Sequence, residues 1–314
     1  MGNYIGSIYD GDKITVSEMI GDPTFIPERI KESLDGAFLE NLLFRDGGTN
    51  EGVVAFRESA APYLNDDAEN VAEFAEIPIT DLNTGRLRSA FAVKTALGVR
   101  ASYEMINFNK LDLLTKQIDA LQKTFIRTSV KASLAAFTAA KVPEVTAKTA
   151  WTAEATADPA YDVFEAIDAI TAATVDGETD EYFDFVPDVL VAHPRVINAL
   201  FRAEKVQDKY IGDAASTNPL FAGYRGVRPE TAFGLRLVES RYLDPTEAII
   251  MEAGAAGFHS DTIPFQVSGF YNEGAPADVS TMGPFMSQRC DAVHKRAVAV
   301  DNPKAVIRIK GVTA

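Results

Sequence analysis

The chain has 314 residues, 46% of them hydrophobic and 24% charged, which is enough apolar material for one large core or two modest ones. Its formal net charge of −15 argues against a protein that reads nucleic-acid sequence, because such proteins carry a basic surface. No apolar run approaches the ~20 residues that cross a bilayer, and the first residues lack the pattern of a secretory signal, so no membrane association is expected.

Along the chain, the first 50 residues predict an extended arm that contains one short helix. Pro27 fits the first turn of that helix, and Gly47-Gly48 ends the segment. Four apolar residues recur at every fourth position, as on one helix face: Ile30, Leu34, Phe38 and Leu42.

The next segment predicts a long excursion from the body. Residues 52–56 (GVVAF) have the composition of a strand, the polar run 57–70 predicts an exposed tip, and 71–79 leads back. A loop of this length normally has a function of its own. From Leu87 to Val99 apolar residues alternate with Arg88, Lys94 and Arg100, which predicts one long strand with one solvated face.

A helix from about Lys110 to Ala140 is the clearest element. Asn109 is the expected N-cap, and Pro143 lies just past the end. About 30 residues give a rod of roughly 45 Å. The apolar face comprises Leu111, Leu114, Ile118, Leu121, Phe125, Ala132 and Ala136. The opposite stripe is basic and meets either solvent or an acidic partner surface; it comprises Lys116, Lys123, Arg127, Lys131 and Lys141.

The remainder mixes short helices and strands. The patterns predict helices at 160–173 and 194–206, and strands at 187–192, 234–239, 247–252 and 264–271. The end of the chain predicts a β-hairpin, with strands at 297–300 and 305–309 and a turn at Asp301-Asn302-Pro303.

The charge is unevenly distributed. Residues 1–80 hold 16 acidic and 5 basic side chains, a net charge of −11, whereas residues 85–141 hold 10 basic and 3 acidic ones, a net charge of +7. This asymmetry suggests that the two regions meet, within one chain or between chains.

No motif for catalysis stands out. His193, His259 and His294 lack metal-ligand spacing, the single Cys290 has no partner for a zinc site or a disulfide, and there is no GxSxG, P-loop or GxGxxG motif. Asp10 and Asp12 lack the later ligands of a calcium loop. The sequence therefore predicts no catalytic residue, no metal and no cofactor. An acidic cytoplasmic α+β enzyme would need a cluster of polar groups that the sequence does not offer.

The order of elements from about residue 25 onward resembles the major capsid proteins of tailed bacteriophages. Its most specific stretch is residues 71–109 (VAEFAEIPITDLNTGRLRSAFAVKTALGVRASYEMINFN), similar to the family's returning loop, its strand with a central lysine (Lys94) and a Ser-x-Glu (Ser102, Glu104) before the spine helix. The tail 296–311 (RAVAVDNPKAVIRIKG) is similar to the family's closing strands.

The resemblance implies an α+β fold of the Hong Kong 97 type. An N-arm would span 1–46, an extended β-hairpin loop 47–85, a peripheral domain with the spine helix 86–144 and 286–314, and an axial domain 145–285. The protein would self-assemble as hexamers and pentamers into an icosahedral virion capsid around double-stranded DNA, in the host bacterial cytoplasm. Its partners would be a portal and a separate scaffolding protein, because the chain has no room for a fused scaffolding segment; the alternative is that no scaffold is required. The alternative is an encapsulin-type nanocompartment shell; the long loop and the acidic arm favour the phage.

Two finer expectations follow from the resemblance. Some members join a loop lysine to a neighbour's asparagine, but here no lysine lies between Lys31 and Lys94 and no asparagine lies in 285–296, so we expect no isopeptide bonds. The N-arm and loop of the family reach adjacent subunits, so acids of the loop are expected to meet bases of a neighbour, the alternative being that these acids stay in solvent. The candidate pairs join Glu58, Asp66, Asp67 and Glu69 to Arg88, Arg100, Arg127 or Lys131.

Overall fold

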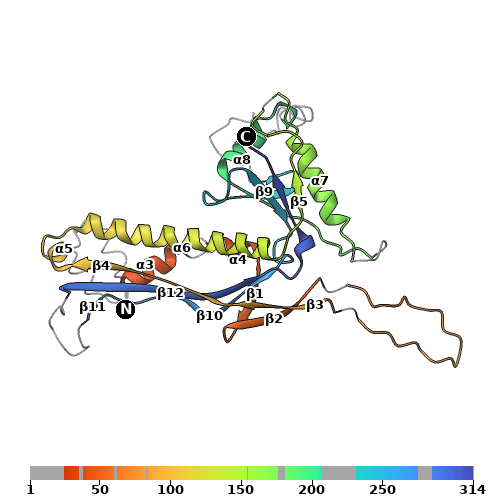
Figure 1. The fold of residues 1–314 in the computed structure, drawn as a ribbon, viewed down its shortest axis with the longest axis horizontal. Helices are drawn as coiled ribbons and strands as arrows, with labels where there is room; N and C mark the ends of the chain where they lie inside the picture. Colours follow the sequence, from red (N-terminus) through yellow and green to blue (C-terminus); the bar gives the residue numbers. More distant parts are fainter. Residues whose placement is uncertain are drawn as a thin grey trace, which may run out of the picture.

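The described residues form two large β-sheets, a two-stranded ribbon, one long helix with several shorter ones, and a projecting loop (Figure 1). The computed structural model describes residues 25–34, 38–59, 62–82, 84–153, 155–175, 181–206, 231–274 and 285–313. Among these residues no helix is both long and apolar enough to cross a membrane.

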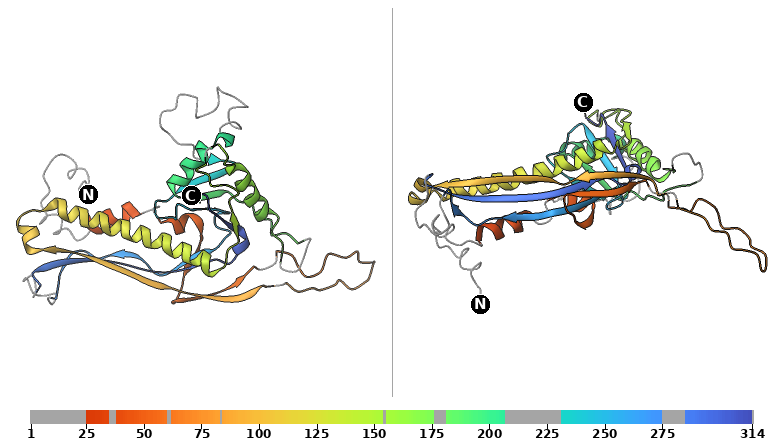
Figure 2. Two further views of the ribbon diagram at one scale, coloured as in Figure 1. Left: turned by 45° about the horizontal axis from the view of Figure 1, so that its top comes forward. Right: turned by 60° about the horizontal axis from the view of Figure 1, so that its bottom comes forward.

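The first sheet forms a long platform beneath the spine helix α6 (Leu111–Ala139). Its described strands are β1 (Arg45–Thr49), β4 (Val93–Ser102), β10 (Phe258–Val267), β11 (Tyr271–Asn272) and β12 (Ser287–Ala299). β12 is the central strand: it pairs antiparallel with β4 along one edge and with β10 and β11 along the other. β1 pairs parallel with β10. In Figure 2, left, α6 runs along this platform.

The spine helix packs on the platform by the apolar face that its sequence predicts, with one change. Leu114, Ile118, Leu121 and Phe125 are buried, but further along the core takes Val130 and Phe137, while Ala132 is exposed. The predicted stripe drifts away from the core because a straight helix has 3.6 residues per turn, so residues spaced by four or seven slowly leave one face.

The start of the spine helix differs from the prediction. Its N-cap position is Lys110, without a side-chain cap, and Asn109 instead adopts a positive φ of 49°. The short helix α5 (Tyr103–Asn107) precedes it and is capped by Ser102, whose hydroxyl accepts a hydrogen bond from the Met105 amide at 3.2 Å. Asn109 is therefore a turn residue between two helices, a place that asparagine fits because it tolerates the left-handed region.

The second sheet forms a separate layer with its own helices. Its described strand order is β5-β13-β9-β6-β8-β7. The strands are β5 (Glu144–Thr146), β6 (Val189–Ala192), β7 (Thr231–Ala232), β8 (Leu235–Glu239), β9 (Glu247–Met251) and β13 (Val306–Lys310). Helices α7 (Pro159–Thr171) and α8 (Pro194–Arg202) contribute to its core around the fully buried Trp151.

The predicted C-terminal hairpin is wrong. β12 and β13 follow each other in the chain, with the short helix η1 (Pro303–Ala305) between them, but β12 belongs to the first sheet and β13 pairs with β9 and β5 in the second. The turn residues have the composition of a hairpin turn, yet β12 pairs with β4 and β10 while β13 pairs with β9 and β5. The division into N-arm, loop, peripheral and axial domains stays a prediction. The strand pairing does not follow its boundaries: β10 lies within the predicted axial domain but joins the first sheet, and β13 lies within the predicted peripheral domain but joins the second.

The predicted arm helix and long strand are each divided. The arm holds α3 (Phe25–Leu34) and α4 (Leu39–Leu43), with Leu42 turned partly to solvent. The strand is interrupted at Ala92: β3 (Arg86–Phe91) pairs with β2 (Val53–Glu58) in a two-stranded ribbon, and β4 continues in the platform. From this ribbon the chain projects as a long loop (Figure 1).

Candidate assembly surfaces

The projecting loop is almost wholly exposed in the single chain. Its two arms are joined near the base by a bridge between Leu64 and Leu82 and by the Asn65 amide, which donates to the Asp81 carbonyl at 3.0 Å. Tyr63 donates from its hydroxyl to Asp184 Oδ2 at 3.1 Å, and this bond raises the pKa of the tyrosine. The loop is thus tied to the body at its base and projects freely beyond it.

Large apolar side chains on the loop and ribbon lack cover. At the loop tip Phe74 is 99% exposed and Ile79 93%. On the ribbon Phe91 is 70% exposed and Leu87 68%. The apolar face predicted for the strand 87–99 therefore exists, but nothing else in the described chain covers it at the ribbon end. Large apolar side chains that are this exposed are typical of a protein–protein interface.

Of the eight charged residues expected at subunit contacts, only Glu58 and Arg88 form an ion pair with each other in the described part of the single chain. Glu58 pairs with Arg88 across the ribbon, with Nε and Oε2 at 2.7 Å, and Arg100 pairs with Glu273 of the platform. The charge of Glu58 and Arg100 is therefore largely satisfied inside the chain.

The other candidates remain available. Asp66 accepts a hydrogen bond from the Thr80 hydroxyl at 2.6 Å, while Asp67 and Glu69 are exposed at the loop tip. Arg127 and Lys131 are exposed on the spine helix and make no ion pair with the residues that the structure describes. The loop points away from this helix, so any contact between them joins different molecules (Figures 1 and 2).

A buried ionic cluster, which the sequence did not reveal, ties the arm to the platform. Arg296 on β12 donates to both carboxylate oxygens of Asp261 on β10, at 2.6 and 2.9 Å. The same guanidinium donates to Glu40 at 3.0 Å and to Asn41 at 2.7 Å, both on α4. His294 lies 3.2 Å from Asp261. These residues are far apart in sequence and carry no local motif, so only the folded contacts identify them.

Burial and charge set the protonation of this cluster. Burial raises the pKa of Glu40, which is only 3% exposed, and the charge of Arg296 opposes that rise only in part. Burial by itself would also raise the pKa of Asp261. The hydrogen bonds and charges of Arg296 and His294 outweigh burial and hold this pKa well below its usual range. The cluster is a cation held between two carboxylates, which fixes α4 against two strands.

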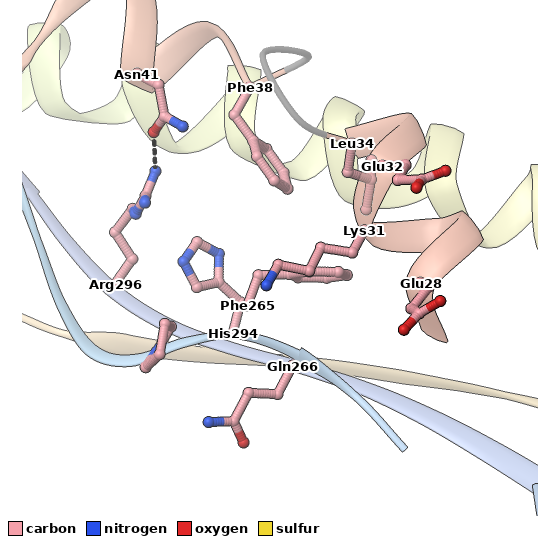
Figure 3. A pocket seen from close by; sticks show the side chains of 11 residues that line it. Glu28, Lys31, Glu32, Leu34, Phe38, Asn41, Phe265, Gln266, His294 and Arg296 are labelled. Carbon is pink, nitrogen blue, oxygen red and sulfur yellow. Dashed lines mark hydrogen bonds between the residues drawn. The ribbon is translucent and has the colours of Figure 1, made fainter. Parts of the chain in front are cut away.

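An open pocket of about 600 Å³ lies beside this cluster (Figure 3). Its floor includes Phe38 and Phe265, whose ring centroids are 6.0 Å apart, and His294. Glu28 and Glu32 of α3 stand at its edge. The arrangement has no nucleophile paired with a base, which an acyl- or phosphoryl-transfer site would need.

The remaining candidates for chemistry are structural. Cys290 is buried, and burial raises the pKa of its thiol to about 11, which leaves it protonated. His193 caps α8, its Nδ1 accepting from the Arg195 amide at 3.0 Å. No group of three or more potential metal ligands occurs in the described part of the chain, and Asp10 and Asp12 lie outside it.

Comparisons with known proteins agree with this structural character. The fold is similar to that of the solved structure "Microbacterium phage Oxtober96", with 14% sequence identity and a TM-score of 0.55 over 85% of this chain and 89% of that one. It is also similar to a virus-like particle from Pyrococcus furiosus, with 9% identity and a TM-score of 0.55 over 92% of this chain and 99% of that one. A third similar structure is the capsid of a native GTA particle, with 12% identity and a TM-score of 0.54 over 88% of this chain and 90% of that one. No curated protein sequence matches the chain. A sequence model described as "Phage capsid protein" matches residues 87–309, most of the chain. The chain therefore belongs to the phage capsid protein family and has the Hong Kong 97-type capsid fold.

Proposed function

We propose that this protein is the major subunit of an icosahedral shell, built from its hexamers and pentamers, that encloses phage double-stranded DNA. The observation that carries the proposal is the combination of the capsid fold with a loop on which two apolar residues, Phe74 and Ile79, are more than nine-tenths exposed. A monomer that stays in solution does not gain from such a loop, whereas a shell buries it at every subunit contact. We further propose a portal and a separate scaffolding protein as partners, the alternative being a shell that needs no scaffold.

Electron microscopy of the purified protein tests this proposal. The protein is produced alone and together with the neighbouring virion genes of its phage, and particles are separated by size. We expect closed shells in at least the second preparation, and DNA in particles recovered from infected cells. A chain that remains monomeric under both conditions, at high concentration, contradicts the proposal.

A second candidate function is a protein-filled nanocompartment. The similarity to the virus-like particle from Pyrococcus furiosus, over 92% of this chain, is the observation that favours it. The particle content separates the two candidates. Protein cargo without DNA supports the compartment, and a DNA-filled particle supports the phage capsid.

We further propose that the acidic loop tip of one subunit lies near the basic spine helix of its neighbour. Since Glu58 and Arg100 already have partners within the chain, the contact rests on Asp67 and Glu69 against Arg127 and Lys131. Exposed pairs contribute little individually, about 0.2–1 kcal/mol, but they recur at every subunit contact of a shell.

Salt and charge neutralisation test this contact. The Debye length falls from about 10 Å at 0.1 M salt to about 3 Å at 1 M, so high salt should weaken capsomer association. The double variant Asp67→Asn/Glu69→Gln should reproduce that effect at low salt. Asp168→Asn, an acid of α7 outside the loop, is the matched control. If neither high salt nor the double variant weakens capsomer association, the contact is refuted and these acids stay in solvent.

A further inference from the structure

The projecting loop leaves the ribbon at a level where both of its strands turn. β2 ends at Glu58, which lies opposite Arg86 at the start of β3. The next residue on each side has a positive φ, 52° at Ser59 and 68° at Gly85. Extended backbone has a negative φ, so the two strands leave the ribbon's direction at the same level. Ser59 and Gly85 therefore form a pivot between the ribbon and the loop. The Ser59 amide donates to the Asp301 carbonyl at 2.8 Å, which fixes the pivot to the segment after β12.

Beyond the pivot, the first part of the loop is cross-linked and turns as one piece. Leu64 and Leu82 on its two arms form a bridge, and the Thr80 hydroxyl donates to Asp66 at 2.6 Å. Extended chain covers about 3.3–3.6 Å per residue, so Phe74, ten residues past Leu64, lies up to about 35 Å further out. At that length a rotation of about 10° at the base moves the tip by roughly 6 Å. Whatever fixes the base therefore fixes where the tip lies.

One side chain at the base ties the loop to the second sheet and its helices. Tyr63 donates from its hydroxyl to Asp184 Oδ2 at 3.1 Å. Among the described residues, this is the one hydrogen bond that joins residues 62–82 to the second sheet or its helices. Asp184 has a φ of 55°, which aspartate tolerates better than most residues. The chain can thus turn at this position while the carboxylate faces the loop.

The segment that carries Asp184 is itself held by the second sheet and its helices. The Phe183 amide donates to the Ala173 carbonyl, just past the end of α7, at 3.0 Å. The Val186 amide donates to Glu252 Oε2, next to the end of β9, at 2.8 Å. Asp184 lies between these two attachments. Its carboxylate therefore follows any movement of α7 and β9.

We propose that the Tyr63–Asp184 hydrogen bond is a strap through which the second sheet sets the direction of the projecting loop, with Ser59 and Gly85 as the pivot. With the strap closed, the loop projects beyond the body as in Figures 1 and 2. With the strap open, the loop turns on the pivot. Tyr63 is 42% exposed, and an exposed hydrogen bond exchanges readily with water, which suits a contact that opens and closes. The inference goes beyond the proposed shell function and rests on it only for its purpose. Subunits of hexamers and pentamers meet at different angles, and the strap makes each loop follow its own second sheet.

Distances between spin labels on free subunits test the strap. Glu69→Cys/Glu165→Cys places one label on the loop and one on the exposed side of α7, and the native Cys290 is buried. Adding Tyr63→Phe removes only the hydroxyl and should widen the distribution of distances about twofold or more. Tyr182→Phe is the matched control, because Tyr182 lies two residues from Asp184 and its hydroxyl makes no hydrogen bond with the described residues. Circular dichroism verifies that the variants are folded.

Substitutions of the acceptor give an independent readout. Asp184→Gly removes the carboxylate and tolerates the positive φ, so it should widen the distribution as Tyr63→Phe does. Asp184→Asn keeps an acceptor oxygen and also tolerates that φ, so its distribution should stay close to that of the wild type. The inference is overturned if Tyr63→Phe or Asp184→Gly leaves the width unchanged, or if Tyr182→Phe widens it equally. Such a result leaves the shell function standing, because the labels report on free subunits. Absence of wild-type shells would instead count against the shell function and not against the strap.

Discussion

Removal of the Arg296 guanidinium should strongly destabilise the subunit, because it leaves buried carboxylates without their cation. The side chain of Arg296 is 11% exposed and that of Glu40 3%, so water can replace little of the lost interaction. Breaking a buried ion pair from one side typically costs 3–5 kcal/mol. We therefore expect Arg296→Met, which keeps much of the side-chain volume, to lower the free energy of unfolding by about 3–5 kcal/mol.

The loss should depend on pH in a direction that the cluster fixes. In the wild type the low pKa of Asp261 stabilises the fold above the carboxyl's ordinary range, and this stabilisation is lost as the pH falls through the folded pKa. The raised pKa of Glu40 has the opposite effect on stability. The stability that the neutral carboxyl contributes is lost as the pH rises through its folded pKa. Without Arg296 both carboxyls bind protons more readily in the folded chain. The deficit of the variant is thus largest near neutral pH and already shrinks as the pH falls from 7 to about 4, the ordinary range of carboxyl groups.

Urea unfolding of dissociated subunits, followed by circular dichroism at pH 7 and pH 4, measures both effects. Arg195→Met is the matched control, because Arg195 is exposed on α8, and such surface changes usually stay within about 0.5 kcal/mol. The reasoning fails if Arg296→Met loses less than about 1 kcal/mol at pH 7. It also fails if the loss is equal at both pH values.

Three further predictions concern other parts of the molecule. Denaturing electrophoresis of mature particles should show one band near 34.0 kDa, because the loop has no lysine for an isopeptide bond; a ladder of covalent multimers would refute this. Trp151→Phe should lower the free energy of unfolding by about 1–3 kcal/mol, because the buried indole Nε1 donates to Asp162 at 2.8 Å. Urea unfolding checks it, and an unchanged midpoint contradicts the assigned bond. Cys290 should resist alkylation at pH 8 in the folded subunit and react once unfolded, because burial raises its pKa to about 11; rapid labelling of the native chain would show the thiol to be accessible.

Local patterns predicted the elements that depend on local interactions. The spine helix was located to within one residue at each end, and α7, β6 and β9 were placed to within one or two residues, because their apolar residues follow the period of the element that they form. The exposure of the loop was likewise recognisable from its polar composition, but residues 57 and 58 belong to β2, and a turn at 72–75 exposes the apolar Phe74 beyond the predicted polar run.

Pairing between distant segments was not predictable in this way. The residues 301–303 favour a turn, but whether the strands on each side pair with one another depends on what else competes for their edges. The Arg296 cluster joins α4, β10 and β12, so its members have no common spacing. Similarly, the apolar alternation from Leu87 onward predicts a buried face, yet Leu87, Phe91 and Val93 are about two-thirds exposed in the single chain.

The central position of β12 has a consequence for the order of events during synthesis. β4 pairs with β12 along its whole length, so that Val99 lies opposite Cys290, near the other end of the chain. At the usual 5–20 residues per second, the ribosome needs roughly ten seconds or more between the two strands. Throughout that interval the spine helix lacks the strand that completes its platform, and such long-range pairing folds slowly. The nascent chain therefore acquires its rigid body, and with it the ability to join a growing shell, only when translation is nearly finished.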